Sequence, residues 1–175
     1  MPTTFTAASG EVFAVLNEVM DEAHTHLRDA GVKVGILMAS NDTGVAIKHA
    51  GYPAAAQIKV VPLADRVSKG YDAEIRIDDD EWADAKPARR KALIDHELCH
   101  LGLVRDEYGK VQTDDLDRPK LRLRKGDFYA GDGFQDVIIR HGEMAYEHTN
   151  SLRVQAAVKG AMSKRRGLFD DVESK

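Results

Sequence analysis

The chain has 175 residues, of which 43% are hydrophobic and 31% charged, with 14 Gly and 5 Pro. These proportions are typical of one compact globular domain, and a chain of this length buries enough surface to fold without disulfides or a structural metal. The 25 basic and 29 acidic residues give a formal net charge of −4. This charge disfavours indiscriminate binding to nucleic acid or to a membrane surface.

Neither export nor membrane insertion is indicated. Residues 1–10 contain no Lys or Arg and no apolar core, and no stretch approaches the roughly 18 consecutive apolar residues of a membrane span. We therefore expect a cytoplasmic protein. The single cysteine, Cys99, excludes an internal disulfide and a cysteine-rich zinc site. Any metal must then be held by histidines and carboxylates.

The first half of the chain predicts one long helix followed by three strands. Apolar residues recur at helical spacing over residues 11–30, and Gly31 then ends the helix. Residues 32–39 and 57–61 are short apolar runs of the kind that form strands. Residues 71–78 alternate apolar and charged side chains, which indicates a strand with one solvated face.

The second half predicts helices around an irregular excursion. Pro87 suits a first helical position, and residues 88–103 can continue that helix. Residues 110–124 resemble an excursion or hairpin that ends in a strand whose leucines, Leu121 and Leu123, form its buried side.

C-terminal helices are expected from residue 134 to residue 162, with a break at Gly142. Residues 163–175 are charged and should form a frayed tail. Within this tail, residues 165–170 resemble the Leu-Phe core of peptides that dock into bacterial sliding clamps, but the usual upstream Gln is missing. A charged end with one apolar pair is therefore favoured over a weak clamp contact.

The chemistry is concentrated in the H-E-x-x-H motif formed by His96, Glu97 and His100. Positions four apart lie one turn above each other on a helix, so both imidazoles project from one face and can bind one divalent ion. The alternative is a surface helix whose two histidines face solvent. The composition gives roughly a 2% chance of such a match arising at random.

Two neutral imidazoles and a third ligand hold Zn²⁺ with one position open, and the pKa of the bound water falls to about 7. Glu97 can then accept the proton of that water as it attacks a carbonyl carbon, and can pass the proton to the leaving amine. The motif thus predicts zinc-dependent hydrolysis of peptide bonds. Asp95 either orients one imidazole from outside the ligand shell or is a solvated helix charge.

Spacing alone leaves the third ligand open. Asp106 follows His100 by six residues, as the last ligand does in the H-E-x-x-H-x-x-G-x-x-H/D pattern, but Leu103 stands where that pattern has glycine. Asp127 and His141 are the other candidates. A lone Asp in a loop is more often a turn residue, and a lone His in a helix is more often a structural or exposed side chain.

Several blocks of the sequence resemble the phage metallopeptidase family. They are L-x-D-H-E-L-x-H-L at residues 93–101, an acidic turn at residues 114–115, R-P-K-L-x-x-R at residues 118–124, and G-D-G-F-x-x-V-x-x-x-H-G at residues 131–142. Residues 53–78 are also similar to the family, so the likeness covers about residues 30–150. The later blocks make the match more specific than the helix motif alone.

The resemblance implies a zinc-dependent peptidase carried by a bacteriophage or prophage. It implies one small zincin-like α+β domain over residues 1–162, with an N-terminal helix, a short twisted mixed sheet, the H-E-x-x-H helix and C-terminal helices. Related sequences carry His-Asp where this chain has Gly126 and Asp127. Asp127 is therefore the first choice for the third metal ligand, before His141 and Asp106.

The predicted site comprises His96, His100 and Asp127 as ligands of Zn²⁺, with Glu97 as the catalytic base. A peptide or protein substrate could add as a further strand beside residues 73–77. One alternative is a zinc-binding interaction module without catalysis. Another is a nucleic-acid-associated protein with an accidental motif, which would use the five positive charges of residues 118–125, although a solvated strand face explains them better.

Overall fold

The computed structural model describes residues 2–42, 44–49, 51–124 and 134–149, together with Leu152 and Ala156. The chain divides into two compact units, residues 1–125 and residues 126–175. Each unit is described by itself, and the expectation of a single domain stays a prediction. The expected tail lies outside the described residues. The fold class is α+β, as predicted.

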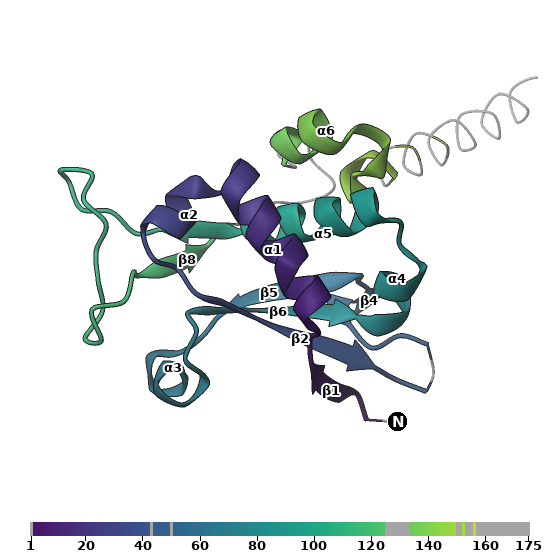
Figure 1. Cartoon of the computed structure of the whole chain (residues 1–175), viewed down its shortest axis with the longest axis horizontal. Helices are drawn as coiled ribbons and strands as arrows, with labels where there is room; N and C mark the ends of the chain where they lie inside the picture. The colour runs from purple at the N-terminus through teal and green to yellow at the C-terminus, as the bar shows by residue number, and fades with distance from the viewer. Residues whose placement is uncertain are drawn as a thin grey trace, which may run out of the picture. The chain divides into compact units, whose positions relative to one another are not determined.

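A four-stranded mixed sheet forms the base of the first unit, with strand order β1-β2-β6-β5 (Figure 1). Its members are β1 (Thr4–Ala7), β2 (Val34–Ser40), β5 (Ala56–Val60) and β6 (Ala73–Asp78). β2 and β6 are parallel, and the other neighbours are antiparallel. The three predicted strands are confirmed. β1 was not predicted, because all four of its residues are exposed and carry no alternation of buried and exposed positions.

One face of the sheet is apolar and is covered by two helices. Ile36, Ile75 and Ile58 lie side by side on β2, β6 and β5, and each is at most 6% exposed. Helices α1 (Gly10–Ala23) and α5 (Pro87–Cys99) pack against each other above this face (Figure 1). Burying an isoleucine side chain contributes about 1.5–3 kcal/mol, so this layer holds α5 firmly on the sheet.

The long N-terminal helix is interrupted. α1 ends at Ala23, and a short helix α2 (Thr25–Asp29) follows. Between them His24 has φ −125° and ψ 37°, outside the helical region, and its side chain is buried. The apolar periodicity continues through this position, so the sequence pattern did not reveal the break.

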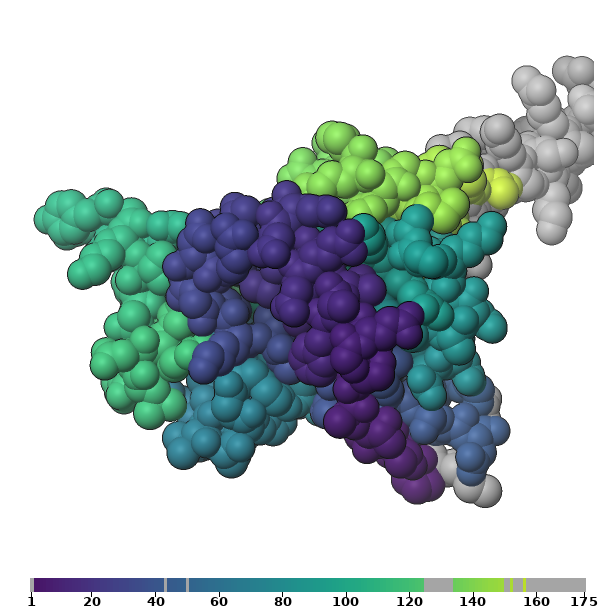
Figure 2. Space-filling view, viewed as in Figure 1, coloured from purple at the N-terminus to yellow at the C-terminus, as the bar shows by residue number. Residues whose placement is uncertain are grey.

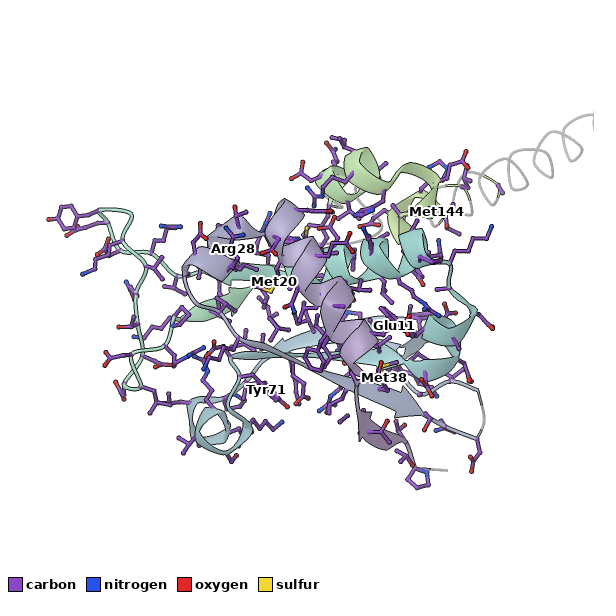
Figure 3. The ribbon with its side chains drawn as sticks, viewed as in Figure 1. Glu11, Met20, Arg28, Met38, Tyr71 and Met144 are labelled. Carbon is purple, nitrogen blue, oxygen red and sulfur yellow. The ribbon has the colours of Figure 1, made fainter. Side chains whose placement is uncertain are left out.

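The opposite face of β6 is less solvated than its alternating pattern predicted. Glu74 is fully buried because Lys59, Lys69, Tyr71 and Arg76 surround its carboxylate. The Tyr71 ring also crosses Gly35 of β2, where a Cβ atom would lie 2.5 Å from the ring. Tyr71 lies on the side of the sheet away from α1 (Figure 3). The expectation of a wet face was therefore wrong for Glu74.

The motif-bearing helix is shorter than predicted. Pro87 occupies the first turn of α5 as expected, but the helix ends at Cys99, and residues 101–103 form strand β7 (Leu101–Leu103) instead of another helical turn. β7 pairs antiparallel with β8 (Leu121–Leu123). The pairing partner lies 20 residues along the chain, which a local pattern does not reveal. The predicted burial of β8 was also wrong in part, since Leu123 is 49% exposed.

The segment between β7 and β8 projects from the rest of the first unit (Figure 2). Partly buried ion pairs hold its base. Arg66 of α3 (Leu63–Lys69) donates to Asp114 at 2.7 Å, and Arg118 donates to Asp72 at 3.1 Å. Asp72 also accepts from the Lys33 backbone at 2.8 Å. These bonds fix where β8 begins and therefore where it ends, next to the C-terminus of α5.

The remaining elements are short. The first unit also contains the hairpin of β3 (Lys48–His49) and β4 (Tyr52–Pro53), and helix α4 (Asp79–Asp84). The second unit contains α6 (Gln135–His141), which confirms the predicted helix, followed at the predicted break by a 3-10 turn, Gly142–Met144. Among the helices of the described segments, none combines the length and the apolar character needed to cross a bilayer.

Candidate metal centre

The candidate site is built on the last turn of α5. Pro87 starts the helix, and His100 is its C-cap with helical dihedral angles of φ −69° and ψ −18°. The i, i+4 relation between His96 and His100 therefore persists to the end of the helix. Both histidines project from one stripe of the helix, as the sequence predicted.

The two imidazoles approach each other through their Nε2 atoms, which are 3.2 Å apart. The ring planes are nearly perpendicular, at 83°, with centroids 4.9 Å apart. Two nitrogens bound at about 2.0–2.1 Å to one tetrahedral zinc ion lie about 3.3 Å apart. The pair therefore fits two corners of such a site, although a hydrogen bond between the rings has a similar length.

The second ring is oriented by the end of β8. His100 Nδ1 lies 3.0 Å from the Arg124 carbonyl oxygen, and the Arg124 backbone N–H donates to the His100 carbonyl at 2.7 Å. Because a carbonyl oxygen only accepts, Nδ1 must carry the proton. In the neutral ring Nε2 then keeps its lone pair, which is the tautomer that binds a metal.

Glu97 lies on the helix stripe next to the two histidines. Its side chain is 4% exposed, and that of His96 is 3% exposed. A carboxylate with this little exposure, one residue away from a ligand pair, is in a suitable place to exchange protons with a molecule bound at that pair. It follows the pattern expected from the sequence.

A neighbouring stripe of the same turn carries a second group of metal-binding side chains. Asp95 accepts a hydrogen bond from His24 Nε2 at 2.6 Å, and Cys99 Sγ is 3.8 Å from the same carboxylate oxygen. All three side chains are buried. Of the two roles considered for Asp95, the solvated charge is excluded. Its carboxylate orients His24 and thereby anchors the end of α1 to α5.

The ligand–ligand distances separate the two groups. The 2.6 Å between His24 and Asp95 is a hydrogen-bond distance, shorter than the separation of about 3.3 Å between ligands of one tetrahedral ion. An ion at that position would have to push the two side chains apart. The 3.2 Å between His96 and His100 needs no such change. The donor geometry therefore favours the motif histidines.

The three candidates for a third ligand lie in different places. Asp127 is outside the described residues. Asp106 accepts backbone hydrogen bonds from Tyr108 and Lys110, both at 2.9 Å, within the turn beyond β7. Because a strand advances about 3.3 Å per residue, β7 carries Asp106 away from the helix end. His141 ends α6 in the second unit.

The expected substrate strand must be revised. β6 pairs with β2 on one side and with β5 on the other, so no backbone edge of residues 73–77 is open to a peptide. The edge strands of this sheet are β1 and β5, and β5 contacts both α5 and β8. The sequence identified the strand correctly but could not give its position in the sheet.

Comparison with known families now adds to this geometry. A family model described as putative phage metallopeptidase matches residues 3–161, which is most of the chain. The chain belongs to this family. Membership of the phage metallopeptidases indicates a metallopeptidase role, protein substrates and a bound metal. No curated protein and no solved structure matches the chain significantly.

Two residues that bond to the last turn of α5 were missed by the sequence analysis. Arg124 acts through its backbone carbonyl, which leaves no signal in residue type. His24 did leave a signal. It follows Leu16 and Met20 at intervals of four residues, so it falls on the buried stripe of the predicted helix, where a histidine needs a polar partner.

Proposed function

We propose that this chain is a zinc-dependent peptidase in which His96 and His100 bind the metal and Glu97 is the general base. The observation that carries the proposal is the 3.2 Å approach of the two Nε2 atoms, with a buried glutamate on the adjacent helix stripe. Zinc is preferred because nitrogen and carboxylate donors in tetrahedral arrangement suit it. When bound, the ion acidifies a water ligand and polarises the carbonyl of the scissile bond.

The protein's own groups then carry the proton transfers. Glu97 accepts a proton from the attacking water as the water oxygen bonds to the carbonyl carbon. It returns the proton to the amide nitrogen as the carbon–nitrogen bond breaks, so that the products are a carboxylic acid and an amine. The Arg124 carbonyl holds the His100 ring in its ligand tautomer throughout.

Asp127 remains our choice for the third ligand. It follows Arg124 by three residues, and a segment of that length spans at most about 10 Å. The Arg124 carbonyl is bonded to the His100 ring. Asp127 therefore lies close enough in the chain to Arg124, and so to the His100 ring, to bind the same ion as His96 and His100.

For the substrate, we propose that an extended peptide pairs with the outer edge of β5. The backbone bonds at both ends of the β5–β6 ladder imply that Ala56, Ile58 and Val60 direct their N–H and C=O groups away from β6. Strand addition at such an edge gives main-chain affinity with little dependence on sequence. The position of β5 beside α5 would bring the peptide to the motif.

Replacement of Glu97 by Gln tests the catalytic role. Gln keeps the size of the side chain and leaves the two histidines in place, but it cannot accept a proton. We expect Glu97→Gln to retain stoichiometric zinc by elemental analysis and to lose about 10²- to 10⁴-fold in kcat on an unstructured protein substrate. Glu107→Gln, an exposed glutamate in the projecting segment, is the matched control and should cleave normally.

The two alternatives give different results in the same experiment. A zinc-binding interaction module would contain zinc and show no cleavage in the unmodified protein. A nucleic-acid-associated protein with an accidental motif would contain no stoichiometric metal and would bind DNA with a steep dependence on salt.

The family name also supports an origin in a bacteriophage or prophage, and hence action in the cytosol of a bacterial host. The proposed clamp contact of the tail is tested by gel filtration with a purified clamp.

A further inference from the structure

A stripe of cations runs along β8 to the candidate metal site. Lys120, Arg122 and Arg124 alternate with leucines and are exposed. Because alternate residues of a strand share a face, their side chains lie on one side of β8, and each is about 6.5 Å along the strand from the next. At its end the backbone of Arg124 is bonded to His100 in both directions. The stripe therefore ends at a proposed zinc ligand.

Arg122 differs from Arg118 and Arg28 in how its charge is used. Arg118, at the base of the projecting segment, is paired with Asp72, and Arg28 is paired with Asp21 and Asp29. Arg122 forms no ion pair with any carboxylate in the described segments. Its exposed guanidinium can therefore bind a carboxylate of another molecule.

Gly102 provides the surface over which the two arginines lie. A Cβ atom at this position would be 3.3 Å from Arg124 Cγ and 3.4 Å from both Cγ and Nε of Arg122. Gly102 is paired with Arg122 across the β7–β8 ladder and lies two residues after His100. The absence of a side chain at Gly102 thus lets both arginine stems lie close to the backbone of β7.

The charge of Arg124 affects the pKa of His26. Partial burial lowers the pKa of His26, and the charges of His24, Arg105 and Arg124 lower it further. Two arginines, Arg105 and Arg124, thus act on His26 in a protein whose formal net charge is −4. Cationic side chains next to a reactive site favour anionic ligands.

We infer that Arg122 and Arg124 form a subsite for the carboxylates of acidic residues in a peptide substrate. This inference rests on the proposed peptidase function and names its substrate class. Two side chains separated by one residue in an extended peptide are spaced like Arg122 and Arg124 on β8. A guanidinium binds a carboxylate through two parallel hydrogen bonds, so the favoured sequence is Asp or Glu at two positions separated by any one residue.

Binding by the full chain, without turnover, tests the inference separately from catalysis. The zinc-loaded Glu97→Gln protein is titrated into a fluorescent peptide with the acidic pair, into its isosteric Asn/Gln version, and into a single-stranded DNA oligonucleotide. All peptides are amidated, which removes the C-terminal carboxylate as the source of the anion. We expect the acidic peptide to bind about tenfold or more tightly than the isostere, with affinity that falls as salt is added.

Substitution locates the effect. Arg122→Gln and Arg124→Gln should each reduce the acidic preference severalfold, and the double variant should abolish it. Lys110→Gln makes the same change of charge at an exposed site on the projecting segment and should keep the preference. Thermal unfolding of each variant shows that it is folded. Equal binding of both peptides, or a preference that survives in the double variant, would overturn the inference.

Two further outcomes are informative. Tighter binding of the DNA than of the acidic peptide, lost in the double variant, would overturn the inference in favour of a nucleic-acid site. Cleavage assays with the unmodified protein report on the peptidase function independently. A protein that prefers acidic peptides and cleaves none would retain the subsite but refute the proposed function, whereas one that cleaves without charge preference would retain the function and refute the subsite.

Discussion

Adjacent residues in the last turn of α5 have different neighbours. Asp95 and Cys99 face His24 between α1 and α2, whereas His96 and His100 face each other. The 100° step between successive residues of a helix produces this division. One turn can therefore anchor the helix to the core with one stripe and present metal ligands with the next.

Removing His24 should destabilise the protein. His24→Ala leaves the Asp95 carboxylate, which is fully buried, without its 2.6 Å donor, and loss of one partner of such a buried pair costs about 3 kcal/mol or more. His26→Ala, two residues along and exposed, should change stability by less than about 0.5 kcal/mol. Urea unfolding of both variants measures the difference. Equal midpoints would refute the anchoring role.

At the scale of elements, the projecting segment and β8 depend on ionic contacts more than on burial. Arg66, Asp72, Asp114 and Arg118 connect α3, the start of β6 and the base of the segment. Burial raises the pKa of Asp114, but backbone bonds from Leu116 and Arg118 and the charges of Arg66 and Arg118 outweigh burial and lower that pKa. These contacts hold the chain at Arg118, three residues before β8 begins.

The polar face of β6 gives a prediction for pH. Burial raises the pKa of Glu74, but hydrogen bonds from Lys59, Lys69, Tyr71 and Arg76 outweigh burial and hold that pKa well below its usual range. A carboxyl whose pKa is lower in the folded chain stabilises the fold above its unfolded pKa of about 4.3, and loses this effect as the pH falls toward the folded value.

Glu74→Gln should therefore be less stable than the unmodified protein at pH 7 by about 1–3 kcal/mol. The loss is limited to this range because the cationic partners of Glu74 are about one-third exposed, so that solvent screens their charges. The difference in the free energy of unfolding between the two proteins should become smaller as the pH falls from 5 to 2. Urea unfolding across this range measures it. A gap that stays constant with pH would mean that the charge of Glu74 does not stabilise the fold.

For the whole molecule, the question is whether metal stabilises a chain that has enough core to fold without it. A ligand present at 100 times its Kd stabilises the folded state by about 2.7 kcal/mol. In a protein of this size that raises Tm by about 5–10 °C. We therefore expect a chelator to lower Tm by this amount and to leave a folded protein.

The same measurement separates the candidate ligands. The zinc-dependent shift should persist in Glu97→Gln, disappear when His96 and His100 are both replaced by Gln, and shrink in Asp127→Asn. Cys99→Ser should leave the shift unchanged. Loss of the shift in Cys99→Ser, with retention in the double histidine variant, would move the metal to the buried group around Asp95. The shift should persist in Asp106→Asn, the candidate that β7 carries away from the helix end, and in Glu107→Gln, the control for an exposed carboxylate.

The sequence by itself determined the local features. The i, i+4 spacing of His96 and His100 placed two imidazoles on one helix face, and short apolar runs and one alternating stretch identified three strands, because these patterns follow from backbone geometry within a few residues. Tertiary structure alone decided that the helix ends at Cys99, that β6 is central in the sheet, and that Arg124 contributes a carbonyl to the site. These features depend on contacts between residues far apart in the chain. Backbone hydrogen bonds such as that of Arg124 cannot be read from the sequence, because almost every residue type has the same backbone N–H and C=O groups.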